Sequence, residues 1–175
     1  MKRRDISEQE MGSRIARFDA LTPSRRAFVD TILPDHERDY FNIIGRGVTE
    51  DAALRPAIAD VGGGFNVSYV RSLPGKRGAL HDHETVEVFI PLQGVYTIIW
   101  GDEGEHQVTL KPHDVISVPP GVMRCFRNDG DVEGLLLVIF GGVNAGRVYW
   151  APHVIEESQK AGWTLTPEGD LVPTQ

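Results

Sequence analysis

The clearest pattern in the sequence is an alternation of hydrophobic and polar residues that begins at Phe65. Phe65, Val67 and Tyr69 alternate with Asn66 and Ser68, and this period of two predicts a half-buried β-strand. Further strand-like runs follow, separated by turns rich in Gly, Pro and Asp: residues 86–92, 95–100, 106–110, 115–118, 124–127 and 135–140. Many short strands at this spacing predict an all-β fold with antiparallel strands, either a sandwich or a barrel.

The N-terminal residues lack this alternation. Residues 13–33 predict two short helical turns, with a helix beginning at Thr22-Pro23-Ser24. Residues 34–59 predict a mixture of loop and short helix, and the polar residues 1–11 are expected to be frayed.

The C-terminal residues predict one short helix, with Pro152 near its start and Gly162 past its end. The expected organisation therefore has three parts. They are an N-terminal arm that packs on the barrel (residues 1–60), the β-barrel itself (residues 61–148), and a C-terminal helix and tail (residues 149–175).

Composition and charge narrow the range of partners. The 175 residues carry a net charge of −7, all of it arising after residue 50, so the sequence has no basic surface suited to nucleic acid or an anionic membrane. Cys125 is the one cysteine, which excludes an intrachain disulfide. We find no secretory signal and no apolar run of about 18 residues. These features predict a cytoplasmic protein that binds a small molecule or another protein.

His81, His83 and Glu87 are the strongest chemical signal in the sequence. Side chains alternate along a strand, so positions 81, 83 and 87 would share one face. Imidazole and carboxylate are ligands for first-row divalent metals, and two histidines with one carboxylate and open positions suit non-haem Fe(II). The alternative is a solvated turn followed by a strand with one buried, hydrogen-bonded glutamate.

Two motifs in this region resemble those of the cupin family. Residues 74–94, PGKRGALHDHETVEVFIPLQG, match the first motif, G-x5-H-x-H-x3-E-x6-G, at every fixed position. Residues 113–128, HDVISVPPGVMRCFRN, match most of the second motif, G-D-x4-P-x-G-x2-H-x3-N. The resemblance implies a cupin-type antiparallel jelly-roll β-barrel with a metal site in its lumen and His81, His83 and Glu87 as ligands. It also implies a homodimer.

Two positions depart from the second motif. His113 stands at its first glycine and is expected to face solvent. Arg124 stands where the family has its fourth ligand, a histidine, and an arginine has no lone pair with which to bind a metal. Two interpretations of Arg124 remain. It forms a salt bridge, with Glu87 for example, in a site that could be metal-free, or its guanidinium holds an anionic substrate beside the metal.

The leading hypothesis is a metal-dependent cupin enzyme, a dioxygenase that acts on a small carboxylate-bearing molecule held by Arg124. Fe(II) is the favoured metal, and Mn, Ni or Zn fit the same donors. Tyr69, expected to point inward, is either a core residue or a catalytic group that orients the substrate or donates a proton. The alternatives are a non-catalytic cupin that binds a small molecule, and a metal-free isomerase or epimerase.

Overall fold

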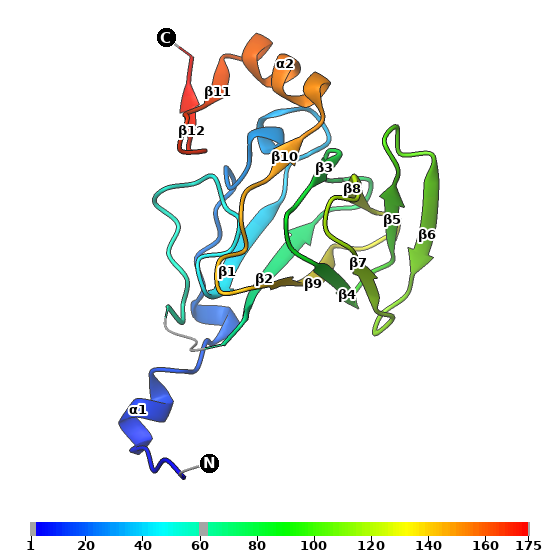
Figure 1. Ribbon diagram of the computed structural model, residues 1–175. Coiled ribbons are helices and arrows are strands. Elements are labelled where there is room, and N and C mark those ends of the chain that lie inside the picture. Colours follow the sequence, from blue (N-terminus) through cyan, green and yellow to red (C-terminus); the bar gives the residue numbers. More distant parts are fainter. Residues whose placement is uncertain (1–2, 60–62, 175) are drawn as a thin grey trace.

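Two antiparallel five-stranded sheets form the body of the protein (Figure 1). The computed structural model describes residues 3–59 and 63–174. The first sheet has the strand order β1-β2-β9-β4-β7 and the second has the order β10-β3-β8-β5-β6. The strands are β1 (Asp39–Ile44), β2 (Phe65–Ser72), β3 (His81–Asp82), β4 (Glu87–Gln93), β5 (Tyr96–Trp100), β6 (His106–Leu110), β7 (Ile116–Val118), β8 (Arg124–Asn128), β9 (Gly134–Gly141) and β10 (Tyr149–Trp150).

The predicted all-β jelly-roll architecture is confirmed. The six strands predicted between residues 86 and 140 agree with β4 to β9 to within one residue at each end. Apolar side chains from both sheets pack together in one core. Phe89 and Val138 of the first sheet belong to the same cluster as Ile98 and Phe126 of the second. No helix in the described part of the chain is long and apolar enough to cross a membrane.

The N-terminal residues differ from the prediction. They form α1 (Glu8–Gly12) and two 3-10 turns, η1 (Phe18–Ala20) and η2 (Val29–Ile32), but no helix begins at residues 22–24. Ser24 instead bridges to Tyr40 of β1. The strand β1 was missed because both of its faces are buried, which removes the alternation that marks a half-buried strand.

The segment before β2 contributes to the core. β1 pairs with β2 along its length, and Phe28 and Tyr40 belong to the main hydrophobic cluster. By contrast α1 buries no residue and projects away from the sheets (Figure 1). The expected boundary between residues 60 and 61 lies outside the described residues.

The C-terminal helix is confirmed as α2 (Pro152–Lys160), with its proline in the first turn. Val154 of this helix packs with Val29 of η2 in a second cluster. The tail beyond α2 forms a hairpin that the sequence did not predict, made of β11 (Trp163–Leu165) and β12 (Leu171–Pro173). Its backbone is fixed to the body of the protein, because Leu171 N donates to the carbonyl of Glu50 at 2.9 Å.

The orientation predicted for β2 is wrong. Asn66, Ser68, Val70 and Ser72 are buried and face the barrel interior, whereas the opposite face, which includes Tyr69, is only partly buried or exposed. Tyr69 therefore points away from the lumen, and its ring contacts Phe18 at a centroid distance of 5.6 Å.

His113 occupies the turn between β6 and β7 in a left-handed conformation. It is exposed, as expected, and its φ of 76° is a value that glycine adopts easily and a β-carbon disfavours. Its N–H donates to the carbonyl of Pro91 at 2.8 Å, which holds the turn in place. A glycine at this position, as in the family motif, would adopt the left-handed conformation without strain.

We predict that His113→Gly stabilises the fold. Relief of the left-handed backbone gains about 1–2 kcal/mol, and the greater freedom of glycine in the unfolded chain offsets part of this gain. The free energy of unfolding from urea titration should rise by about 0.5–1 kcal/mol. A variant that is less stable than the wild type would show that the histidine side chain makes a compensating contact.

Candidate metal centre

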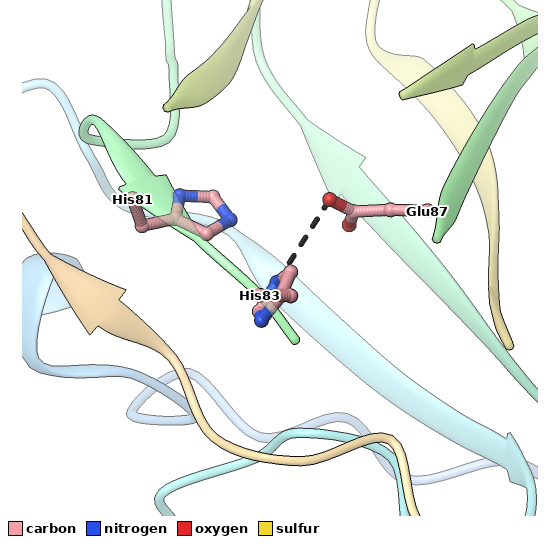
Figure 2. Close-up of side chains that lie close together, drawn as sticks. All are labelled: His81, His83 and Glu87. Carbon is pink, nitrogen blue, oxygen red and sulfur yellow. Dashed lines mark ion pairs between the residues drawn. The ribbon is translucent and has the colours of Figure 1, made fainter. Parts of the chain in front are cut away.

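Three buried side chains point toward a common space inside the barrel (Figure 2). His81 lies in β3, His83 follows this strand, and Glu87 is the first residue of β4. One ligand atom of each lies within 4.8 Å of the others, and His83 Nε2 is 3.8 Å from Glu87 Oε2. Donors about 2.0–2.2 Å from one metal ion lie about 3–4 Å apart, so shifts of about 1 Å would close this group on an ion.

Both imidazoles are held in one orientation by backbone carbonyls. His81 Nδ1 lies 2.8 Å from the carbonyl oxygen of Ala79, and His83 Nδ1 lies 2.9 Å from that of Arg147. A carbonyl only accepts, so each Nδ1 carries a proton and donates it. Each neutral ring then has its lone pair on Nε2, which is the arrangement that metal-binding histidines use. The donor set therefore fits a divalent metal ion.

The environment keeps these histidines neutral. Burial lowers the pKa of His81 well below its usual value, and the nearby His83 and Arg124 lower it further. Burial also lowers the pKa of His83, although Glu87 opposes the shift. A neutral imidazole is the form that binds metal, so no proton has to leave either ring at neutral pH.

Arg124 lies where the sequence predicted, pointing into the barrel beside Glu87. Its side chain is fully buried, and its Nε donates to Glu87 Oε2 at 2.8 Å. Nη1 donates to the carbonyl of Val122 at 3.0 Å, whereas Nη2 is buried and has no hydrogen-bond partner among the described residues. Of the two interpretations, the salt bridge with Glu87 is observed, and Nη2 with its two N–H groups remains available for a ligand.

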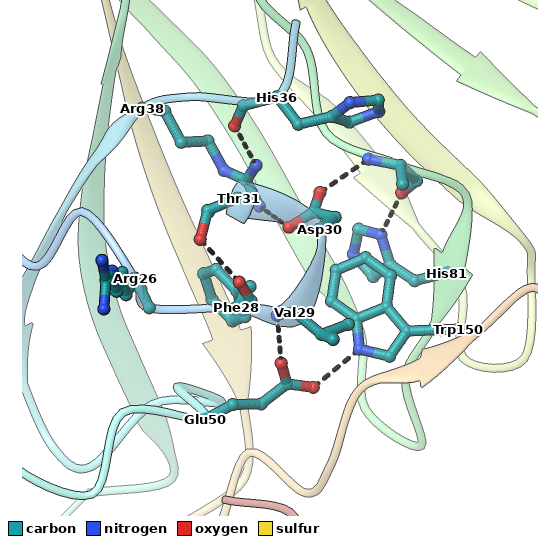
Figure 3. A network of polar contacts seen from close by, with 12 residues as sticks. Arg26, Phe28, Val29, Asp30, Thr31, His36, Arg38, Glu50, His81 and Trp150 are labelled. Atoms are coloured by element: carbon teal, nitrogen blue, oxygen red, sulfur yellow. Dashed lines mark hydrogen bonds and ion pairs between the residues drawn. The ribbon is translucent and has the colours of Figure 1, made fainter. Parts of the chain in front are cut away.

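A network of residues from the N-terminal segment holds the backbone next to His81 (Figure 3). Asp30 accepts from the N–H of Ala79 at 2.8 Å and also pairs with Arg38 at 2.8 Å. Ala79 is the residue whose carbonyl fixes His81. The network thus connects a buried ion pair to the orientation of a candidate ligand.

Glu50 and Trp150 complete this support. Glu50 accepts from the backbone N–H of Val29 and from Trp150 Nε1, both at 2.6 Å. The Trp150 ring packs on His81 at a centroid distance of 5.1 Å. The sequence does not predict these residues as part of the site, because they come from segments without a local motif and meet only in the folded chain. They are Asp30, Arg38, Glu50 and Trp150.

The lumen beside the three ligands is small. Its cavity has a volume of about 30 Å³, enough for about two water molecules. Next to it lies a polar cleft of about 480 Å³, whose lining includes Val48 and Val148, which also line the lumen cavity. The C-terminal hairpin forms one wall of this cleft through Leu165 and Asp170.

Of the site residues predicted from the sequence, Arg124 and the three candidate ligands lie together, whereas Tyr69 lies apart from them. Tyr69 is on the outer face of β2, so a catalytic role for it in this lumen has no support in its position. Phe126 faces the lumen two residues after Arg124, and Cys125 between them lines a different pocket.

Comparison with known proteins agrees with this geometry. Residues 68–140 match the family model described as Cupin domain, whereas no curated protein matches the sequence. Among solved structures, the Schizosaccharomyces pombe Cnp3 cupin domain is similar, with 12% identity, 72% of each chain covered and a TM-score of 0.51. KdgF from Halomonas sp. has 14% identity over 72% of this chain and 92% of that one, with a TM-score of 0.51.

DMSP lyase DddQ from Ruegeria pomeroyi DSS-3 has 20% identity and a TM-score of 0.52, over 71% of this chain and 57% of that one. At such identities the likeness is one of fold. The antiparallel jelly roll and its buried His–His–Glu group define a β-barrel protein with a site in the lumen. Residues 68–140 thus resemble a cupin domain, and they carry all three candidate ligands and Arg124.

We predict that Glu50 makes stability fall between about pH 7 and about pH 8. Burial raises the pKa of its carboxyl from 4.5 to about 8, so in this range the folded state binds a proton that the unfolded state has released. The contribution of Glu50 to the free energy of unfolding is complete below pH 4.5 and is lost as the pH rises through 8. The lowered pKa values of His81 and His83 act in the opposite direction, but below about pH 7.

Urea unfolding at the two pH values tests this expectation. The wild-type free energy of unfolding should fall by about 1 kcal/mol from pH 7 to pH 8, whereas Glu50→Gln should show little change. An equal decline in both proteins would mean that another group is responsible.

Proposed function

We propose that this cupin binds a divalent metal ion, by preference Fe(II), through His81, His83 and Glu87, and acts as a dioxygenase on a small anionic molecule. The observation that carries the proposal is the fixed orientation of both imidazoles, which presents Nε2 of each to the same buried space as Glu87. Non-haem iron held by two histidines and one carboxylate supplies oxygenase chemistry when it is bound.

The charges of the lumen favour an anionic substrate. Arg124 is neutralised by Glu87, Arg38 is neutralised by Asp30, and both histidines are neutral. A divalent ion would therefore add two positive charges with no counter-charge from these pairs. Buried charge needs compensation, and a carboxylate or another oxyanion on the substrate would provide part of it.

Two buried guanidinium nitrogens are available to bind such an anion. Arg124 Nη2 and Arg38 Nε each lack a hydrogen-bond partner among the residues that the structure describes, and Arg38 lines the lumen cavity. Either could donate a charge-assisted bond to a bound carboxylate, and this would orient the molecule beside the ligands.

The apolar rings of the lumen would exclude water from this space. The cavity is lined by aromatic residues on several sides: Phe28, Phe89, Phe126, Phe140 and Trp150. Its small volume leaves room for the reacting end of a substrate only after some side-chain movement, so the remainder would occupy the polar cleft beyond Val48 and Val148.

One observation favours a second candidate function. The 2.8 Å bond between Arg124 and Glu87 occupies an oxygen that a metal ion would otherwise use. A metal-free site that binds a small anion as a non-catalytic module is consistent with that bond. Metal titration separates the two candidates.

The first test is metal binding itself. Equilibrium dialysis against Mn²⁺ or Co²⁺ with elemental analysis should give one ion per chain. His83→Ala should weaken binding by about 100-fold, because loss of one imidazole leaves two protein ligands. The matched control is His153→Ala, which removes an exposed histidine of α2 and should change nothing. Wild-type protein that retains no ion would favour the metal-free candidate.

The second test separates the roles of Arg124. Arg124→Met should raise metal affinity, because it removes a nearby positive charge and releases Glu87. It should also weaken acetate binding by about 10- to 100-fold, as expected for the loss of a charge-assisted bond. Arg124→His should raise metal affinity too, since it restores the family's fourth imidazole.

The control for this test is Arg127→Met on the same strand. Arg127 faces outward and pairs with Asp129, so its loss should affect neither metal nor acetate. Unchanged metal and acetate affinities in both Arg124 variants would remove Arg124 from the proposed site.

A further inference from the structure

A second cleft, called here the outer cleft, lies on the side of β8 that faces away from the lumen. Side chains alternate along this strand, so Phe126 faces the lumen while Cys125 and Arg127 line the outer cleft. The outer cleft has a volume of about 380 Å³, which is within the range of small-molecule sites. It shares no lining residue with the lumen cavity or with the polar cleft beside it. An occupant would therefore be separate from the proposed substrate.

The most deeply buried residues of the outer cleft are mainly apolar. Leu33, Cys125 and Val154 are all buried and line it from three different segments of the chain. Burial raises the pKa of the Cys125 thiol to about 11, so the thiol is uncharged at neutral pH and acts as apolar surface. These residues suit the apolar body of a ligand and leave its polar groups to the walls.

His36 presents a hydrogen-bond acceptor to this cleft. The residue is 7% exposed and lines the cleft, and its ring is directed away from Arg38 (Figure 3). Nδ1 lies 2.8 Å from the carbonyl oxygen of Pro34 and donates to it, because a carbonyl only accepts. Burial lowers the pKa of His36, so the ring is neutral and Nε2 carries a lone pair. No described residue forms a hydrogen bond with Nε2, so a ligand there has to be a donor.

Arg77 brings a positive charge that the described residues do not neutralise. Arg77 and Arg127 are bridge partners and both line the cleft, and like charges opposite each other on paired strands are unfavourable. Asp129 accepts from Arg127 Nη2 at 2.8 Å, whereas no carboxylate in the described part of the chain pairs with Arg77. Arg77 also adds to the effect of burial on the pKa of His36, so its charge lies near the free acceptor. An anion would compensate this charge.

Two glutamates limit how much negative charge the cleft can hold. Glu103 lies in the turn between β5 and β6, Glu157 lies in α2, and both line the cleft with exposed side chains. A second negative charge on an occupant would be repelled by these carboxylates. The cleft therefore favours a ligand with one negative charge.

We propose that the outer cleft binds a small monocarboxylic acid that also carries a hydroxyl or N–H donor. The carboxylate would accept from the Arg77 guanidinium, the donor would bond to Nε2 of His36, and the apolar body would cover Cys125 and Val154. Ala79 also lines this cleft, and its carbonyl is the group that orients His81. An occupant would thus contact the backbone that positions a candidate metal ligand.

The test is titration of the full-length protein with para- and meta-hydroxybenzoate, followed through the backbone amide signals in NMR spectra. At least one isomer should bind with a Kd below about 1 mM and shift the signals of Ala79, Cys125 and Val154. Arg77→Ala, at an exposed position, should weaken binding by about 10- to 100-fold through loss of a charge-assisted bond. The matched control is Arg46→Ala, which removes an exposed arginine of the polar cleft and should change nothing.

Benzoate tests the role of His36, because it lacks the hydroxyl. It should bind the wild type about 2- to 10-fold more weakly than the better hydroxybenzoate, and this difference should disappear in His36→Phe. Arg77→Ala keeps the proposal testable if His36→Phe does not fold. Four results would overturn the proposal: no binding at millimolar concentration, shifts that centre on the polar cleft, an Arg77→Ala variant that binds like the wild type, or equal affinity of the wild type for benzoate and both isomers. None of these results depends on metal binding.

Discussion

The buried ion pair between Arg124 and Glu87 is the interaction on which the interior of this barrel depends. It joins β8 of the second sheet to β4 of the first, across a space otherwise lined largely by apolar side chains. Without a bound ion, removal of one partner would leave the other charge buried and uncompensated, which typically costs about 3–5 kcal/mol. The pair also fixes the carboxylate against His83, and Arg124 is the register partner of His81. The position of each candidate ligand is thus tied to the same two residues.

This pair also changes what the lumen can bind. An arginine at the fourth ligand position leaves two imidazoles and one carboxylate as donors, and it cancels the charge that Glu87 would offer to a cation. Under the proposed function, the site would bind a cation and an anion together, because each would offset the charge that the other brings. The support behind His81 comes from Asp30, Glu50 and Trp150, so the N-terminal segment contributes to the site as well as to the core.

The sequence predicted the cupin domain well because its signals are local. The spacing of His81, His83 and Glu87 and the short strands between turns depend on near neighbours in the chain. The failures have tertiary causes. A period of two identifies the two faces of β2 but not which one is inside, and here the more apolar face points outward while Asn66 and Ser68 point inward. The strand β1 has no alternation because both of its faces are covered.

The most direct test of the account is anomalous diffraction from crystals of the wild-type protein grown with Mn²⁺ and acetate. The account predicts one strong anomalous peak per chain, bonded to Nε2 of His81, Nε2 of His83 and an oxygen of Glu87. It also predicts that Arg124 remains in the lumen, with its free N–H groups directed at a bound anion. A lumen without a peak, or a peak that does not contact these three side chains, would contradict it.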